Sequence, residues 1–131
     1  MLVPSINTLG FPDWTFAQVV AFAQAQKIPY IEIRALENTT DLLSLPQFSS
    51  AEGIHAAARL LHESGVGLLS LNLGFHLADD LFPQSEAIRR CAALGSDLGA
   101  RYLRFFSGGS PGEPPDLERI AQGAGLVNHL L

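Results

Sequence analysis

Four short apolar segments of this chain are each followed by a longer segment with helical periodicity, and this alternation constrains the fold more than any other feature. Residues two apart share a face of a strand, whereas residues three or four apart share a face of a helix. Alternating strands and helices predict a parallel sheet with crossover helices. The strand-like segments are 3–9, 30–35, 66–73 and 102–107, and the helical segments are 15–27, 51–64, 85–100 and 116–131.

Local signals mark where two of the predicted helices begin and end. Thr15 and Gln18 have the spacing of a capping box, and Ser49 and Glu52 repeat it before segment 51–64. Gly65 is expected to end that second helix. The long connection before it, residues 36–50, suits either a lid or a packing segment.

Each predicted strand has one apolar face and one polar face. An open sheet covered by helices on both sides needs two apolar faces, whereas a barrel keeps its helices outside and turns the other face inward. The sequence therefore predicts an α/β fold, a parallel (βα)4 half of a TIM-type (β/α)8 barrel with helices on the outer face. The apolar face carries Ile6, Ile31, Ile33, Leu69, Leu71, Leu73, Leu103 and Phe105, and the polar face carries Ser5, Asn7, Glu32, Arg34, Ser70, Asn72, Arg104 and Ser107.

The charges of Glu32 and Arg34 inside one strand are the least expected part of this pattern. A buried charge costs several kcal/mol unless it is paired or hydrated. We expect both side chains to line a wet barrel mouth, where they pair with each other and with Arg104. A purely structural ion pair is the open alternative.

Composition narrows the class of protein. The chain has 131 residues, of which 47% are apolar and 16% charged, as in one globular domain. The net charge of -5, with Lys and Arg scattered, argues against binding to nucleic acid. The single cysteine, Cys91, predicts a packed core thiol and a reducing cytoplasm. No apolar run reaches the roughly 18 residues of a membrane helix, and the start of the chain does not look like a secretion signal.

Several stretches together carry a resemblance to a known family. They read SINTLGFPDWTFAQVVAFAQAQKIPYIEIR, LSLNLGFH and ARYLRFFSGG. In this order they resemble the sugar phosphate isomerase/epimerase family of xylose-isomerase-like TIM barrels, over essentially the whole chain. The resemblance implies a barrel of eight βα units, of which residues 1–131 form an N-terminal half-domain. Its four units are expected at roughly 3–28, 29–65, 66–100 and 101–131.

The resemblance also implies chemistry. Members of the family move protons on sugars or polyols with a divalent metal, Mn, Mg, Zn or Co, held at the barrel mouth by residues of later strands. This chain ends in its fourth helix, so we assign no metal ligand here. We expect the chain to be truncated and its isomerase or epimerase activity to be incomplete.

Residues at the mouth of the first half are the candidate site. Proton transfer beside a carbonyl needs a base and a group that holds the developing negative charge. We assign Glu32 and His76 to catalysis, although Arg34 beside Glu32 favours an orienting role for that carboxylate, and His76 can equally be a loop residue. The resemblance places the substrate-binding residues at Asn7, Arg34, Asn72, Arg104, Ser107 and Gly108. Trp14, in a loop at the same mouth, is expected either to wall the sugar pocket or to cap the end of the barrel.

The two arginines present forks suited to a phosphate or carboxylate. Backbone N–H groups of residues 107–112 can approach the same anion, although a plain flexible loop fits that segment too. His55, His62 and His129 are read as surface or packing residues, because their spacing does not suit a shared ion.

Three functions remain open from the sequence. The first is a piece of a metal-dependent sugar isomerase. The second is a non-catalytic half-barrel that self-associates and binds a small anion or sugar. The third is a flavodoxin-like open domain that binds an anion at residues 107–112. The expected partners are a sugar or sugar phosphate and either a second copy or a missing C-terminal half-barrel, with no nucleic acid and no membrane.

Overall fold

The computed structural model describes residues 1–131 and contains one parallel sheet of four strands, in the order β1-β2-β3-β4. Each strand pairs only with its neighbours in the chain, as in the wall of a barrel. A flavodoxin-like sheet has its strands in the order 2-1-3-4-5, so the third function considered above is wrong in its fold. The strands are β1 (Ser5–Asn7), β2 (Tyr30–Ile33), β3 (Gly67–His76) and β4 (Tyr102–Phe106).

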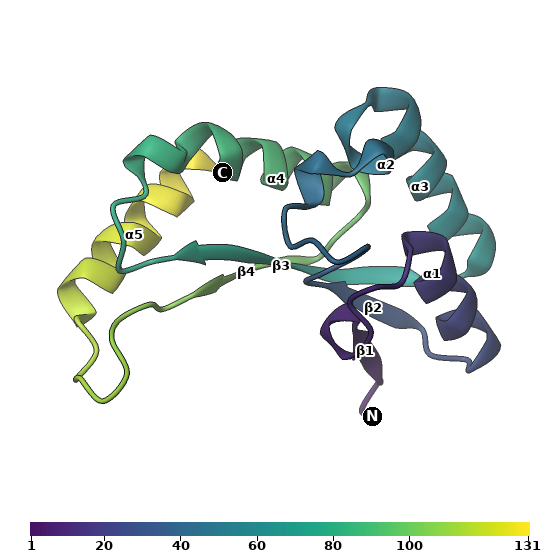
Figure 1. Ribbon diagram of the computed structural model, residues 1–131, viewed down its shortest axis with the longest axis horizontal. Helices are drawn as coiled ribbons and strands as arrows, with labels where there is room; N and C mark the ends of the chain where they lie inside the picture. The colour runs from purple at the N-terminus through teal and green to yellow at the C-terminus, as the bar shows by residue number, and fades with distance from the viewer.

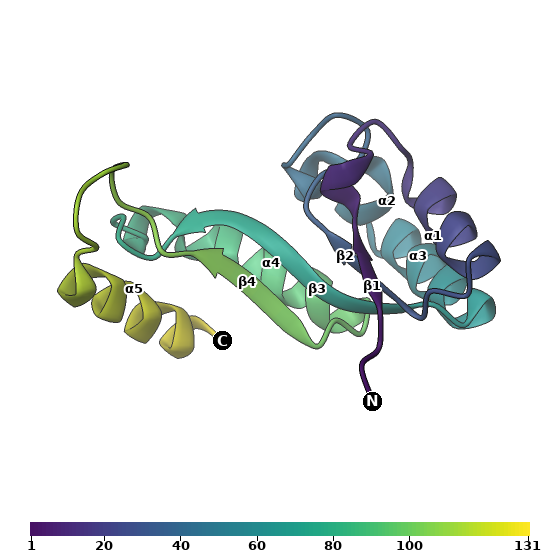
Figure 2. The ribbon, with the colours of Figure 1, turned by 90° about the horizontal axis from the view of Figure 1, so that it is seen from below.

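Helices gather on one side of this sheet, as Figure 1 shows for α2 to α5. From below, strands β3 and β4 lie in front of α4 (Figure 2). None of the helices combines the length and the apolar character that a membrane crossing requires. The helices are α1 (Phe16–Ala25), α2 (Pro46–Ser49), α3 (Ala51–Ser64), α4 (Ser85–Asp97) and α5 (Leu117–Leu130), with single 3-10 turns η1 (Thr8–Gly10), η2 (Leu42–Ser44) and η3 (Phe82–Gln84).

The helix ends follow the sequence signals with one exception. The Gln18 N–H donates to Thr15 Oγ1 at 3.2 Å and the Thr15 N–H donates to Gln18 Oε1 at 2.9 Å, which confirms the capping box. Gly65 ends α3 with a φ of 69°, as predicted. The predicted cap at Ser49 is wrong, because that residue ends the short helix α2; Ser50 caps α3 instead, accepting from the Gly53 N–H at 3.0 Å.

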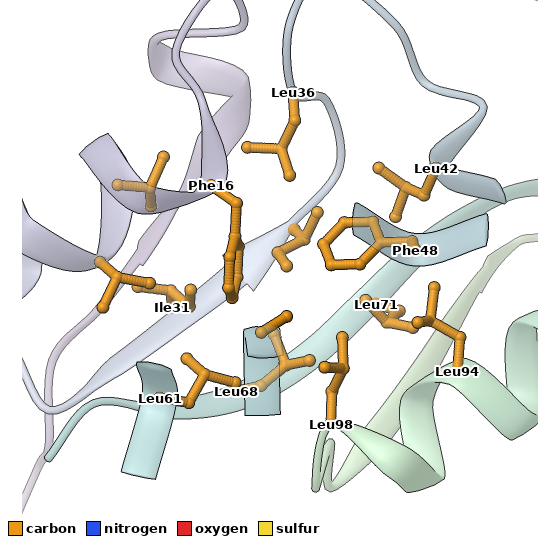
Figure 3. Close-up of a cluster of buried hydrophobic side chains, with 14 of the residues drawn as sticks. Phe16, Ile31, Leu36, Leu42, Phe48, Leu61, Leu68, Leu71, Leu94 and Leu98 are labelled. Atoms are coloured by element: carbon orange, nitrogen blue, oxygen red, sulfur yellow. The ribbon is translucent and has the colours of Figure 1, made fainter. Parts of the chain in front are cut away.

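One hydrophobic core fills the space between the sheet and helices α1 to α4. Figure 3 shows side chains from these helices meeting over Ile31, Leu68 and Leu71 of the sheet. Phe16 and Phe48 meet there edge to face, with ring centroids 5.4 Å apart. The connection 36–50 is therefore a packing segment and not a lid, since it buries Leu36, Leu42, Leu45 and Phe48.

A bulge changes one residue of the predicted core. Ile31 of β2 pairs with Leu68 of β3, but the next residue, Glu32, pairs with Ser70. Leu69 is left over between the two pairs, so strict alternation breaks there. The core residue is Leu68, which is 2% exposed, and the prediction of Leu69 on the apolar face is wrong.

Val127 of helix α5 forms a second, smaller hydrophobic cluster with Leu81 and Ile88. Gly123 is buried with its Cα directly against the backbone of Leu77, which leaves no room for a side chain. Leu117 at the start of the helix is exposed, so the first turn does not contribute to this packing.

We predict that Gly123→Ala lowers the free energy of unfolding by roughly 1–3 kcal/mol, because the new methyl group must displace the Leu77 carbonyl. Gly125 is the matched control, since it lies in the same helix with open space around it. Gly125→Ala should raise the free energy of unfolding by about 0.5–1 kcal/mol through helix propensity. Urea unfolding curves measure both values, and equal effects of the two substitutions would contradict the packing of α5.

The buried Cys91 gives a second prediction. Burial raises the pKa of this thiol from 9.0 to about 11, the negative charge of Asp41 adds to the rise, and Arg90 opposes it. The unfolded thiol loses its proton at a lower pH than the native one, so the contribution of Cys91 to stability is complete below about 9 and is lost by about 11. The free energy of unfolding should fall more steeply over this range in the natural chain than in Cys91→Ala. Parallel slopes would show that the thiol is hydrated.

Candidate functional site

The face of the sheet opposite the core carries a row of polar residues near the ends of the strands. Asn72 of β3 is the register partner of Arg104 of β4. Arg34 follows the pair formed by Ile33 and Leu71 by one residue, which places it beside Asn72. Arg34, Asn72 and Arg104 therefore lie side by side across three strands, and we refer to them as the inner row.

Glu32 lies one step back from the inner row and does not pair with Arg34. Its carboxylate accepts from the Ser5 hydroxyl at 2.6 Å, and the Ser70 Oγ lies 3.4 Å from its other oxygen. The predicted ion pair between Glu32 and Arg34 is wrong, because the Ser5 hydroxyl donates to the carboxylate while Arg34 extends toward the end of the sheet. Glu32 thus ties β1 to β2 and β3.

Hydrogen bonds fix the backbone of Arg34, whereas its guanidinium group contacts an aromatic ring and leaves one buried nitrogen without a hydrogen-bond partner. The N–H groups of Arg34 and Ala35 donate to the Oγ1 of the buried Thr8, at 2.9 and 3.1 Å. The guanidinium carbon lies 5.6 Å from the centroid of the Phe106 ring. Its Nη1 is buried and has no hydrogen-bond partner. Neither Thr8 nor Phe106 was found from the sequence.

The other two residues of the inner row also keep free donors. Arg104 places its guanidinium carbon 5.5 Å from the same Phe106 ring centroid and forms no ion pair. Asn72 is 2% exposed; its Oδ1 accepts from the Ser70 hydroxyl at 2.8 Å, and its Nδ2 is buried without a partner. Two positive charges and two unpartnered buried donors therefore meet on one small surface.

His76 stands at the end of β3 and not in a loop as predicted, because β3 resumes pairing there with Phe106 of β4. Its ring meets the Phe106 ring edge to face at 5.6 Å, and its Nδ1 lies 3.7 Å from Asp79 Oδ2. The imidazole is half exposed. His76 therefore borders the inner row through the shared aromatic ring.

The turn after β4 is held against His76. The Ser107 carbonyl accepts from the Ala78 N–H at 2.9 Å. Gly108 has a φ of 82°, and a Cβ on it would lie 2.9 Å from the His76 Cβ. The residue must be glycine on both counts.

Two of the predicted binding residues have local structural roles. Asn7, the register partner of Glu32, accepts from the Leu9 N–H at 2.9 Å and so caps the turn after β1. Trp14 stacks on Phe11 with centroids 4.5 Å apart and packs with it against the core. The structure thus gives Trp14 a packing role.

The residues present do not fit a metal centre. No three side chains among the His, Cys, Asp and Glu residues gather closely enough to hold an ion. His76 and Asp79 form only a pair, and His55, His62 and His129 are exposed on helices α3 and α5.

A parallel sheet in chain order, with helices on one face and polar residues on the other, defines half of a (β/α)8 barrel. Comparison with solved structures agrees. A protein from Sinorhizobium meliloti 1021 matches with a TM-score of 0.65 and 23% identity, over 96% of this chain and 45% of its own. A xylose isomerase domain protein from Planctomyces limnophilus matches with a TM-score of 0.63 and 14% identity, over 96% and 49%.

A third match is D-allulose 3-epimerase from a Methylomonas species, solved with D-allulose, at a TM-score of 0.63 and 18% identity, over 98% of this chain and 46% of that one. No protein-family model and no curated protein sequence matches. The chain thus spans about half the length of the solved structures it resembles. They show its fold, which is half of a (β/α)8 barrel.

The hydrogen bonds of Glu32 yield a prediction that separates a structural role from a catalytic one. Glu32→Gln should lower the free energy of unfolding by about 1–2 kcal/mol, because an amide replaces the charged acceptor of the Ser5 hydroxyl. Glu63→Gln on the exposed surface of α3 is the control and should change it by less than about 0.5 kcal/mol. Thermal unfolding measures both effects. An unchanged free energy of unfolding in Glu32→Gln would contradict the structural role of this carboxylate and leave it available for catalysis.

Proposed function

We propose that this chain forms the sugar-binding first half of a barrel that isomerises or epimerises a sugar or polyol. The observation that carries the proposal is the inner row, whose donors remain free near the C-terminal ends of the strands, where a barrel binds its substrate. Its fold is shared with an epimerase solved with a sugar. The inner row also suits sugar hydroxyls, which offer several acceptors on a small ring.

In the proposed reaction a base removes the proton from the carbon beside the carbonyl. The electron pair of that C–H bond forms a C=C bond, and the carbonyl oxygen takes the negative charge of an enediolate. Return of a proton to the opposite face gives the epimer, and its return to the neighbouring carbon gives the isomer. The guanidinium groups of Arg34 and Arg104 in the inner row are proposed to stabilise the negative charge of the enediolate oxygen.

Residue roles follow from which groups are already engaged. His76 is proposed as the proton-transfer residue, because its imidazole is half exposed at the edge of the inner row. Glu32 is proposed to position Ser5 and not to act as the base, since its carboxylate accepts from the Ser5 hydroxyl at 2.6 Å. Substrate contacts are proposed for Arg34, Asn72 and Arg104, with Asn7, Ser107 and Gly108 shaping the surrounding surface.

The divalent metal expected from the resemblance is proposed to be held by residues outside this chain. A metal at the mouth would supply charge stabilisation for the enediolate oxygen. The chain is accordingly proposed to need further barrel strands for full activity.

A second candidate function is a non-catalytic half-barrel that associates with another copy. The outer edges of β1 and β4 are unpaired. A largely apolar groove of about 600 Å³ lies beside β4, between α4 and α5, where Leu103, Phe105 and Val127 are among its lining residues. Both features leave surface available for more sheet, either from a second copy or from a C-terminal half.

The test of the proposed function is solvent exchange at a sugar carbon. The chain is incubated with D-allulose in D₂O, and proton NMR follows both binding by saturation transfer and loss of the C–H signal beside the carbonyl. We expect binding and slow exchange, with exchange lost in His76→Gln and retained in His55→Gln, an exposed histidine on α3.

Binding without exchange would favour the non-catalytic candidate, and light scattering would then show whether the chain is a dimer. Absence of both binding and exchange would overturn the proposed function.

A further inference from the structure

We propose that Phe106 is a positioning residue, whose ring fixes the side chains that meet the substrate at and beside the inner row. Those side chains are Arg34, Arg104 and His76. The reaction that this arrangement serves rests on the proposed function. The arrangement itself rests on contacts within the chain and can be tested without a sugar.

Side chains from neighbouring strands meet at the Phe106 ring. The guanidinium carbons of Arg34 and Arg104 lie 5.6 and 5.5 Å from its centroid. The His76 ring meets it edge to face at 5.6 Å. Neither arginine forms an ion pair, so the ring is the contact that holds these two like charges close together. Without it, their mutual repulsion would favour separation of the two side chains.

The backbone holds the Phe106 ring in this place. Phe106 is the register partner of His76, and its carbonyl accepts from the Leu77 N–H at 2.8 Å. Strand β3 takes four residues, from Asn72 to His76, to advance as far as β4 does in two, from Arg104 to Phe106. This bulge brings His76 level with the ring, and bulges beside active sites commonly redirect a side chain in this way.

Gly74 lies in the same bulge and leaves the gap across which Arg34 reaches the ring. A Cβ on Gly74 would lie 3.5 Å from Arg34 Nη2 and 3.7 Å from Nη1, so the guanidinium group occupies the space beside this residue. Alanine fits there at ordinary contact distance, whereas the branched side chain of valine needs the space of the guanidinium. The φ of Gly74 is not positive, so neither substitution strains the backbone.

Fixed guanidinium groups beside His76 are already organised for the charge that develops on the enediolate oxygen. Positive charge held in place stabilises a transition state more than a neutral substrate, because no ordering is needed during the reaction. Loss of the Phe106 ring should therefore lower the rate of proton exchange more than the affinity for the sugar. A residue that only supports the fold would not separate these two effects.

The first experiment reads the arrangement without sugar. Proton NMR follows the Nε–H signals of Arg34 and Arg104, because an aromatic ring shifts the signals of protons close to it. The variants are Phe106→Leu, which removes the ring, and Phe106→Tyr, which keeps it, with Phe105→Leu as the matched control. Phe105 is the preceding residue of β4 and lines the groove between α4 and α5 instead. Circular dichroism establishes that every variant is folded.

We expect Phe106→Leu to shift the Nε–H signals of both arginines, while Phe106→Tyr and Phe105→Leu leave them close to their natural positions. Gly74→Val should shift the signal of Arg34 more than that of Arg104, and Gly74→Ala should leave both in place. Unchanged signals in Phe106→Leu would overturn the proposal. If Phe106→Leu does not fold, Gly74→Val decides, because an unmoved Arg34 signal in that variant would overturn the proposal as well.

The second experiment is the exchange of D-allulose in D₂O at saturating sugar. Phe106→Leu should exchange about tenfold or more slowly than the natural chain, with a smaller loss of affinity, and Phe106→Tyr should recover most of the rate. Exchange at the natural rate in Phe106→Leu, or equal losses of rate and affinity, would overturn the positioning role. If the arginine signals respond as expected and the natural chain shows no exchange, the arrangement stands and the proposed reaction fails.

Discussion

The structure depends on one arrangement, a parallel sheet in chain order whose helices all cover the same face. Burial of Ile31, Ile33, Leu68 and Leu71 beneath those helices supplies the main stabilisation of the fold. Because that core uses only one face, the alternating residues of the same strands must face the other way. The polar inner row is thus a direct consequence of how the core is built, and its residues are positioned by strands that the core holds rigid.

The inner face is organised into two zones with different tasks. One step back from the inner row, Glu32 accepts a hydrogen bond from Ser5 of β1 and lies beside Ser70 of β3, so its charge has a structural role. Nearer the strand ends, the Phe106 ring contacts the side chains of Arg34, Arg104 and His76, whose polar groups remain largely free. This separation explains how the sheet can carry charged residues within its strands and remain stable. It also places the reactive groups where a barrel opens to its ligand.

The sequence was sufficient for what depends on local pattern. The four βα units, the capping box at Thr15 and the polar character of one strand face could be predicted, because periodicity and capping act within a few residues. What depends on register between distant strands could not. The bulge at Leu69 and the strand position of His76 arise from pairing with β2 and β4. The pairing of Glu32 with Arg34 was expected from their separation of two residues, yet Ser5, 27 residues away, takes the carboxylate. Phe106 could not be predicted as part of the site, because nothing in the sequence indicates that an aromatic residue at the end of a strand contacts two arginines from other positions.

The most direct test of this account is a crystal structure of the chain grown or soaked with D-allulose. The account predicts the sugar within hydrogen-bond distance of Arg34 and Asn72, with Glu32 still bonded to Ser5. A structure in which Arg34 instead pairs with Glu32, or in which the sugar leaves the inner row empty and binds elsewhere, would contradict it.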